Sequence, residues 1–190
     1  MCSVTEASAH LALKKTYQTI CDSANAGYLA YIESPQATIH CARTAAGSVN
    51  DHIWSQLVNR MDGEAGVTPH FDNRRNLRFL KVDAKPSPIL LWLKQVDAGR
   101  HHRIFPTSHA CKVLDNGQSE MFPRAEILVL GFTINRDRTG ILRVSINPPS
   151  RIAAPEWWID LVPVASTKLF ATTEHLAFEV KRSQQVKLQA

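Results

Sequence analysis

The hydrophobic pattern of this chain changes its period near Gly66, and that change constrains the fold more than any other feature. Before Gly66, apolar residues recur at steps of three and four, which predicts helices with one buried face. After Gly66, apolar and polar residues alternate or form short apolar runs, which predicts strands. Helices followed by strands are typical of an α+β fold.

Two long helices are predicted in the first third of the chain. The first runs from Thr5 to about Ile32, where Ser34-Pro35 ends it. Its apolar face consists of Leu13, Tyr17, Ile20, Ala24, Tyr28 and Tyr31. The second is predicted to begin at Ser48, because Ser48 and Asp51 have the spacing of a capping box, and to end at Gly63.

Five strands are predicted in the rest of the chain, at 76–83, 89–96, 125–134, 141–147 and 157–164. Short turns join the first two and the next two, so we expect two antiparallel hairpins. Between the hairpins, Thr107 is predicted to cap a short helix that ends at Gly117. The expected fold is one α+β domain over 1–164, with a helical layer at 1–63 and an antiparallel sheet of about five strands at 67–164. Residues 165–190 read as a polar tail.

Composition excludes several classes of protein. A chain of 190 residues with 44% hydrophobic residues can bury a core without disulfides. The apolar runs are too short to span a bilayer, and the N-terminus has no secretory pattern, so no membrane partner is expected. The four cysteines are scattered, which is typical of reduced thiols in the cytoplasm. Cys21 lies on the apolar face of the first helix, so it is predicted to be a core residue.

The positive charge is concentrated in the middle of the chain. The formal net charge is +5, and residues 60–112 hold ten Lys and Arg against five Asp and Glu. A local surplus of this kind favours an anionic partner, either nucleic acid or an acidic protein. The residues predicted to contact such a partner are Arg74, Arg75, Arg78, Lys94, Arg100, His101, His102 and Arg103. The alternative is a solvated basic face of the sheet.

Histidine is a common metal ligand, but the spacing of the histidines in this chain argues against a metal site. Eight histidines occur, and no helical HxxxH pair or CxxC pair is among them. Adjacent His101 and His102 point apart on an extended chain. Phosphate-binding and dinucleotide-binding motifs are absent as well. The sequence therefore predicts neither a metal nor a cofactor.

A catalytic alternative rests on the second helix. Asp51, His52 and Arg43 could serve as a metal-free acid–base site of a nucleic-acid-cleaving toxin. The competing explanation for Asp51 is structural, because it occupies the capping-box position after Ser48.

Four stretches, at 34–54, 89–110, 130–149 and 158–161, resemble a family of little-characterised bacterial proteins from mobile-element, toxin–antitoxin and phage-defence operons. The matching residues are Arg43, Thr44, Asp51, His52, Lys94, Asp97, Pro106, Thr107 and Gly131. The chain departs from the family pattern at Trp92, Gln95 and Phe132. The resemblance implies a co-encoded regulator or toxin as partner, and it implies no particular activity.

The function expected from the sequence is therefore non-enzymatic. We expect an interaction or nucleic-acid-associated protein of a bacterial regulatory, toxin–antitoxin or defence system, which contacts an acidic partner through a basic surface. The two alternatives are the nucleic-acid-cleaving toxin and a structural homodimer module.

Overall fold

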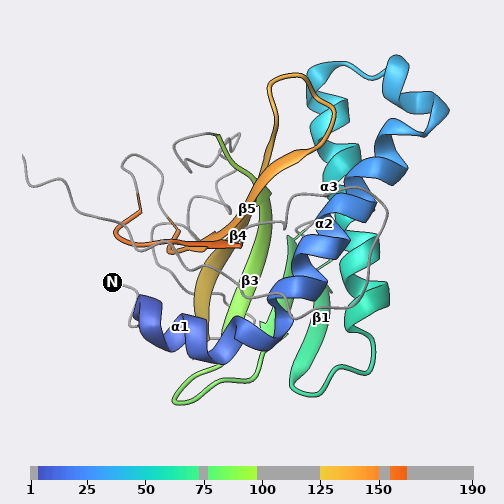
Figure 1. Ribbon diagram of the computed structural model, residues 1–190. Helices are drawn as coiled ribbons and strands as arrows, with labels where there is room; N and C mark the ends of the chain where they lie inside the picture. The colour runs from blue at the N-terminus through green and yellow to red at the C-terminus, as the bar shows by residue number, and fades with distance from the viewer. Residues whose placement is uncertain (1–3, 73–76, 98–124, 150–154, 162–190) are drawn as a thin grey trace, which may run out of the picture.

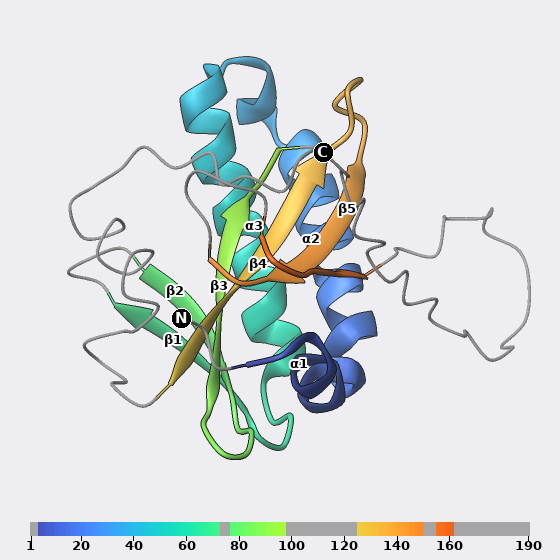
Figure 2. The same ribbon diagram turned by 90° about the vertical axis from the view of Figure 1, so that its left-hand side faces the viewer.

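The computed structural model describes residues 4–72, 77–97, 125–149 and 155–161, without the side chains of Arg43 and Asp72. Within these residues, two long helices cover one face of a six-stranded sheet, and a shorter helix crosses near its lower end (Figure 1). Figure 2 shows the same layers with the two long helices behind the sheet. The α+β fold predicted from the sequence is confirmed. No helix in the described ranges is long and apolar enough to cross a membrane.

The predicted first helix is present, divided by a tighter turn. Helix α1 (Glu6–Leu13) is followed by the 3₁₀ segment η1 (Lys14–Thr16) and by α2 (Tyr17–Ile32). All six residues of the predicted apolar face are buried. Cys21 is buried as predicted, and its Sγ donates to the carbonyl oxygen of Leu161 at 3.6 Å. Burial raises the pKa of the Cys21 thiol to about 12, so this cysteine is an inert core residue.

Helix α3 (Ala42–Met61) begins six residues earlier than the sequence predicted, after the 3₁₀ segment η2 (Pro35–Thr38). The segment before Ser48 is rich in alanine, the best helix former, and it extends the helix. Ser48 is therefore an interior residue, and its Oγ lies 3.3 Å from His40 Nδ1. The capping explanation for Asp51 is wrong, because no helix begins there.

Within the described ranges, the sheet contains six strands in sequence order: β1 (Val67–Asp72), β2 (Leu77–Val82), β3 (Ile89–Gln95), β4 (Glu126–Ile134), β5 (Ile141–Asn147) and β6 (Ile159–Leu161). The predicted hairpins β2–β3 and β4–β5 are both present. The sheet is mixed rather than wholly antiparallel, because β3 and β4 run parallel. Parallel neighbours need a long connection, and the sequence has thirty residues between the end of β3 and the beginning of β4. The predicted short helix at 107–117 lies outside the described residues.

Strand β1 was not predicted from the sequence. Its segment contains Pro69, which counts against a strand because proline cannot donate a ladder hydrogen bond. The structure resolves the conflict by placing β1 at the edge of the sheet, where Pro69 lies opposite Leu80 and one side of the strand needs no partner.

Two apolar clusters hold the described part of the chain together, one on each face of the sheet. The larger lies between the sheet and the helices and includes Leu57, Leu80 and Phe132. The smaller lies on the other face and includes Phe79 and Trp92. The central strands β3 and β4 are thus buried on both faces, as their nearly continuous apolar sequences require.

Candidate anion-binding groove

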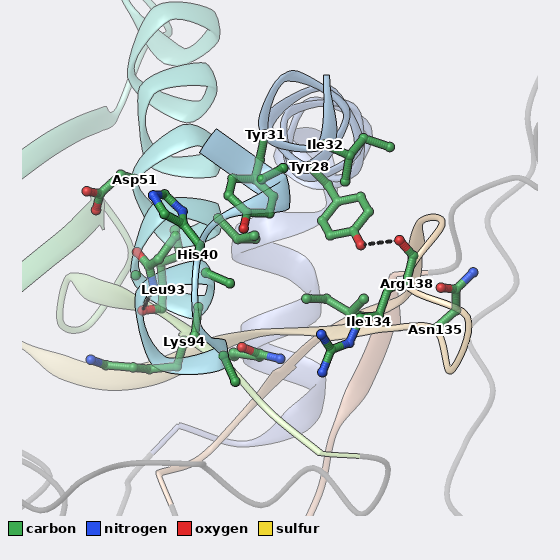
Figure 3. A pocket seen from close by; sticks show the side chains of 18 of the residues that line it. Tyr28, Tyr31, Ile32, His40, Asp51, Leu93, Lys94, Ile134, Asn135 and Arg138 are labelled. Atoms are coloured by element: carbon green, nitrogen blue, oxygen red, sulfur yellow. Dashed lines mark hydrogen bonds between the residues drawn. The ribbon is translucent and has the colours of Figure 1, made fainter. Parts of the chain in front are cut away.

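A groove of about 920 Å³ opens at the carboxyl ends of β3 and β4, beside the beginning of α3 (Figure 3). The end of α2, η2 and the turn between β4 and β5 complete its walls. Clefts at the carboxyl ends of neighbouring parallel strands are the usual place for ligands in parallel and mixed sheets. The charged residues among its described lining are Arg78, Lys94, Arg136, Arg138 and Asp51. Four cations therefore face one carboxylate.

Arg78, from β2, is held against α3 at one side of the groove. Its Nη1 forms an ion pair with Asp51 and lies 3.4 Å from Asn50 Oδ1. The guanidinium also lies 5.2 Å from the centre of the Phe71 ring. Among the described residues, Arg78 donates hydrogen bonds through Nη1 alone. Because these contacts hold the guanidinium while Nη2 makes no hydrogen bond to the described residues, Arg78 is positioned to bind an anion.

Lys94 lies near the end of β3, and its Nζ is 4.3 Å from the centre of the Trp92 ring. Burial, followed by the positive charge of Arg78, lowers the pKa of Lys94 to about 8. No carboxylate among the described residues pairs with its ammonium group. An anion bound beside Lys94 would supply the missing counter-charge and raise its pKa.

Lys94 and Arg78 reach the groove from different faces of the sheet. Side chains alternate along a strand, so Lys94 emerges on the same face as Trp92, whereas Arg78 contacts α3 on the face that the helices cover. In Figure 3, Lys94 extends on the same side of the groove as Asp51 and away from Asn135 and Arg138. The groove therefore wraps around the end of β3.

The opposite wall of the groove is the turn between β4 and β5, which the sequence predicts. The stretch NRDRTG was predicted to join β4 and β5, and Asn135 Oδ1 accepts hydrogen bonds from Thr139 N at 2.8 Å and Gly140 N at 3.3 Å. Tyr28 donates from its hydroxyl to the Arg138 carbonyl oxygen at 2.7 Å (Figure 3). These bonds fix the turn against α2. Arg136 and Arg138, which the sequence interpretation did not select, are exposed on it beside the groove.

Of the residues predicted to contact an anionic partner, Arg78 and Lys94 line the groove. The other six lie outside the described residues, namely Arg74, Arg75, Arg100, His101, His102 and Arg103. Arg78 and Lys94 are separated by fifteen residues and a turn in the sequence. Only the pairing of β2 with β3 brings them to one end of the sheet.

The residues of the catalytic alternative do not point to a common centre among the groups that the structure describes. The carboxylate of Asp51 is bound to Arg78, and its side chain is 62% exposed. The His52 ring lies instead against Tyr31, with 6.1 Å between ring centres. Arg43 precedes Asp51 by eight residues on the same helix, a rise of about 12 Å. The catalytic interpretation stays a prediction.

Other residues from the sequence resemblance have structural roles. Gly131 lies opposite Lys94 in the parallel pair, and a Cβ there would be 3.0 Å from both Val96 methyl carbons and 3.2 Å from Ser145 Oγ. The Asp97 carbonyl oxygen accepts from Thr133 Oγ1 at 3.4 Å, which ties the end of β3 to β4. Pro106 and Thr107 lie outside the described residues.

Within the described ranges, no three histidine, cysteine or acidic side chains are grouped in a way that could hold a metal ion. Comparison of the chain with protein-family models, with curated proteins and with solved structures finds no significant match to any of them.

Proposed function

We propose that this protein is a non-enzymatic, nucleic-acid-associated protein that binds phosphates of a nucleic acid strand in the groove at the end of β3. The observation that carries the proposal is the charge of the groove: Arg78, Lys94, Arg136 and Arg138 line it, and Asp51 is its only described acidic residue. The basic segment of the sequence, from 60 to 112, supports the same partner.

The contacts expected are to the phosphate backbone rather than to bases. Arg78 offers Nη2, and Lys94 offers an ammonium group without a carboxylate partner among the described residues. The tryptophan and tyrosines that line the groove, Trp92, Tyr28 and Tyr31, are only 1%, 3% and 6% exposed, so they cannot serve as stacking platforms. Binding should therefore depend strongly on salt and weakly on sequence.

Neutralising two groove cations should weaken binding of single-stranded oligonucleotides and reduce its salt dependence. Each phosphate contact contributes about 0.7 to the slope of log K against log salt for single strands, so the double substitution R78Q/K94Q should lower the slope by about 1.4. Fluorescence anisotropy of labelled RNA and DNA strands, titrated with protein at several salt concentrations, measures both quantities.

The matched control is K81Q/K85Q, which removes the same charge outside the groove. Lys81 lies on the same strand as Arg78 and pairs with Asp83, and neither lysine lines the groove. This variant should retain more of the affinity. The proposal fails if the wild-type protein binds no strand at low salt, or if the two double variants lose affinity equally.

The partner implied by the sequence resemblance belongs to the same proposal. A co-encoded regulator or toxin with an acidic segment would use the same cations. It should therefore compete with oligonucleotides for the groove rather than bind beside them. A homodimer module, the remaining alternative, would form dimers without binding RNA or DNA oligonucleotides.

The nucleic-acid-cleaving alternative has a separate test. If His52 is the acid–base group, the substitution H52A should reduce cleavage of labelled RNA or DNA by at least about a hundredfold, the usual contribution of such a group. His52 is partly buried beside Tyr31, so circular dichroism must show that the variant remains folded. Cleavage at the wild-type rate by a folded H52A protein excludes this alternative.

A further inference from the structure

The amine of Lys94 has surroundings that phosphate binding alone does not require. Its Nζ lies against the face of the Trp92 ring in the groove, at 4.3 Å from the ring centre. Arg78 lines the same groove, its charge lowers the pKa of the amine, and no described carboxylate pairs with Lys94. A lysine that is partly buried beside another cation is the arrangement that produces nucleophilic amines.

We propose that Lys94 captures a small anionic aldehyde or ketone covalently and reversibly, as an imine, with Arg78 binding the anionic group of the ligand. The groove has the size of a small-molecule site, at about 920 Å³. This inference uses the same groove as the proposed function and adds a second class of ligand. Its chemistry requires a free amine, which phosphate binding does not.

The reaction is balanced without an oxidant or a reductant. The lone pair of the uncharged amine adds to the carbonyl carbon, and the carbonyl oxygen takes up protons and leaves as water. The nitrogen loses its protons as the carbon–nitrogen double bond forms. The products are one imine and one water molecule, and the addition of water reverses the step.

The protonation state of Lys94 favours this step near neutral pH. With a pKa of about 8, roughly half of the Lys94 side chains carry an uncharged amine at pH 8. A lysine with an ordinary pKa of about 10.4 is uncharged in well under one molecule in a hundred at that pH. The rate of capture should therefore rise with pH up to about 8, whereas capture by surface lysines continues to rise at higher pH.

The charge of the groove favours a ligand with an anionic group. Arg78 Nη2 makes no hydrogen bond to the described part of the chain, and Asp51 and Asn50 hold Nη1. Arg136 and Arg138 line the same groove from the turn between β4 and β5. A neutral carbonyl compound would leave these cations without a counter-charge, so a phosphate or carboxylate should increase capture.

The test uses pyridoxal 5′-phosphate as the anionic aldehyde and sodium borohydride to reduce the imine to a stable secondary amine. The full-length protein is treated with a limiting amount of aldehyde at pH 8, reduced, digested and mapped by mass spectrometry. We expect at least tenfold more label on Lys94 than on Lys81 or Lys85. Pyridoxal, which lacks the phosphate, should label Lys94 several-fold less, and so should pyridoxal 5′-phosphate in R78Q.

Because the main comparison is made within the wild-type protein, it does not depend on how a variant folds. Equal labelling of Lys94 and the surface lysines overturns the proposal. Preferential labelling of Lys94 that is the same with pyridoxal overturns the role of Arg78. If oligonucleotides bind but Lys94 is not labelled, this inference fails and the proposed function stands. If Lys94 is labelled but no oligonucleotide binds, only the proposed function fails.

Discussion

Replacing Gly27 with alanine should destabilise the protein by at least about 3 kcal/mol, the upper part of the range for overpacked cores. Gly27 lies in α2 where this helix crosses α3, and a Cβ there would be 2.5 Å from Ile53 Cα and 2.6 Å from Ile53 N. Both atoms belong to the backbone, so a change of side-chain rotamer cannot relieve the clash. The helices would have to separate along their whole contact. Urea denaturation of G27A and wild type measures the difference.

Gly47 provides the matched control in α3. A Cβ at Gly47 has no neighbour within 4 Å, and alanine is the better helix former by about 1 kcal/mol. The substitution G47A should therefore stabilise the protein slightly while G27A destabilises it. A G27A protein as stable as the wild type would show that α2 and α3 do not cross as closely as described.

The substitution W92A should cost about 3–5 kcal/mol, the range observed when a buried tryptophan or phenylalanine is truncated. Trp92 is 1% exposed on β3, beside Phe79 on β2, with 6.1 Å between the ring centres. Its loss opens a cavity on the face of the sheet away from the helices. It also removes the ring on which Lys94 lies. Thermal and urea denaturation give the change in stability.

The substitution W92F separates the two effects. Phenylalanine keeps an aromatic ring and most of the packing, so the stability loss should be less than half that of W92A. A stability loss below about 1.5 kcal/mol for W92A is near the cost of an Ile to Val substitution. It would mean that the sheet face away from the helices is not a packed core.

Local periodicity was enough to predict most of the helices and strands. The apolar face from Leu13 to Tyr31 predicted α1 and α2, and the alternation after Gly66 predicted β2 to β6. The start of α3 and strand β1 were not predicted correctly. Ser48 has the chemistry of a cap, yet the alanines before it extend α3. Strand β1, which contains Pro69, was missed, and its edge position accommodates the proline.

The candidate site could be predicted only in part. The basic segment identified Arg78 and Lys94 as candidates, because a charge surplus is visible in composition. It did not identify Arg136 and Arg138, because the turn that carries them looks like an ordinary connector until Tyr28 binds it to α2. The ion pair of Arg78 with Asp51 spans twenty-seven positions, a separation that no local pattern encodes.

The sequence by itself determined the order of the elements, their buried faces and the sign of the charge, because these depend on neighbouring residues along the chain. Only the tertiary structure decided that β3 and β4 run parallel and that a groove opens at their ends. It also decided the state of Lys94, because a pKa depends on burial and on nearby charges from other strands. Burial of this kind exists only after the chain has folded.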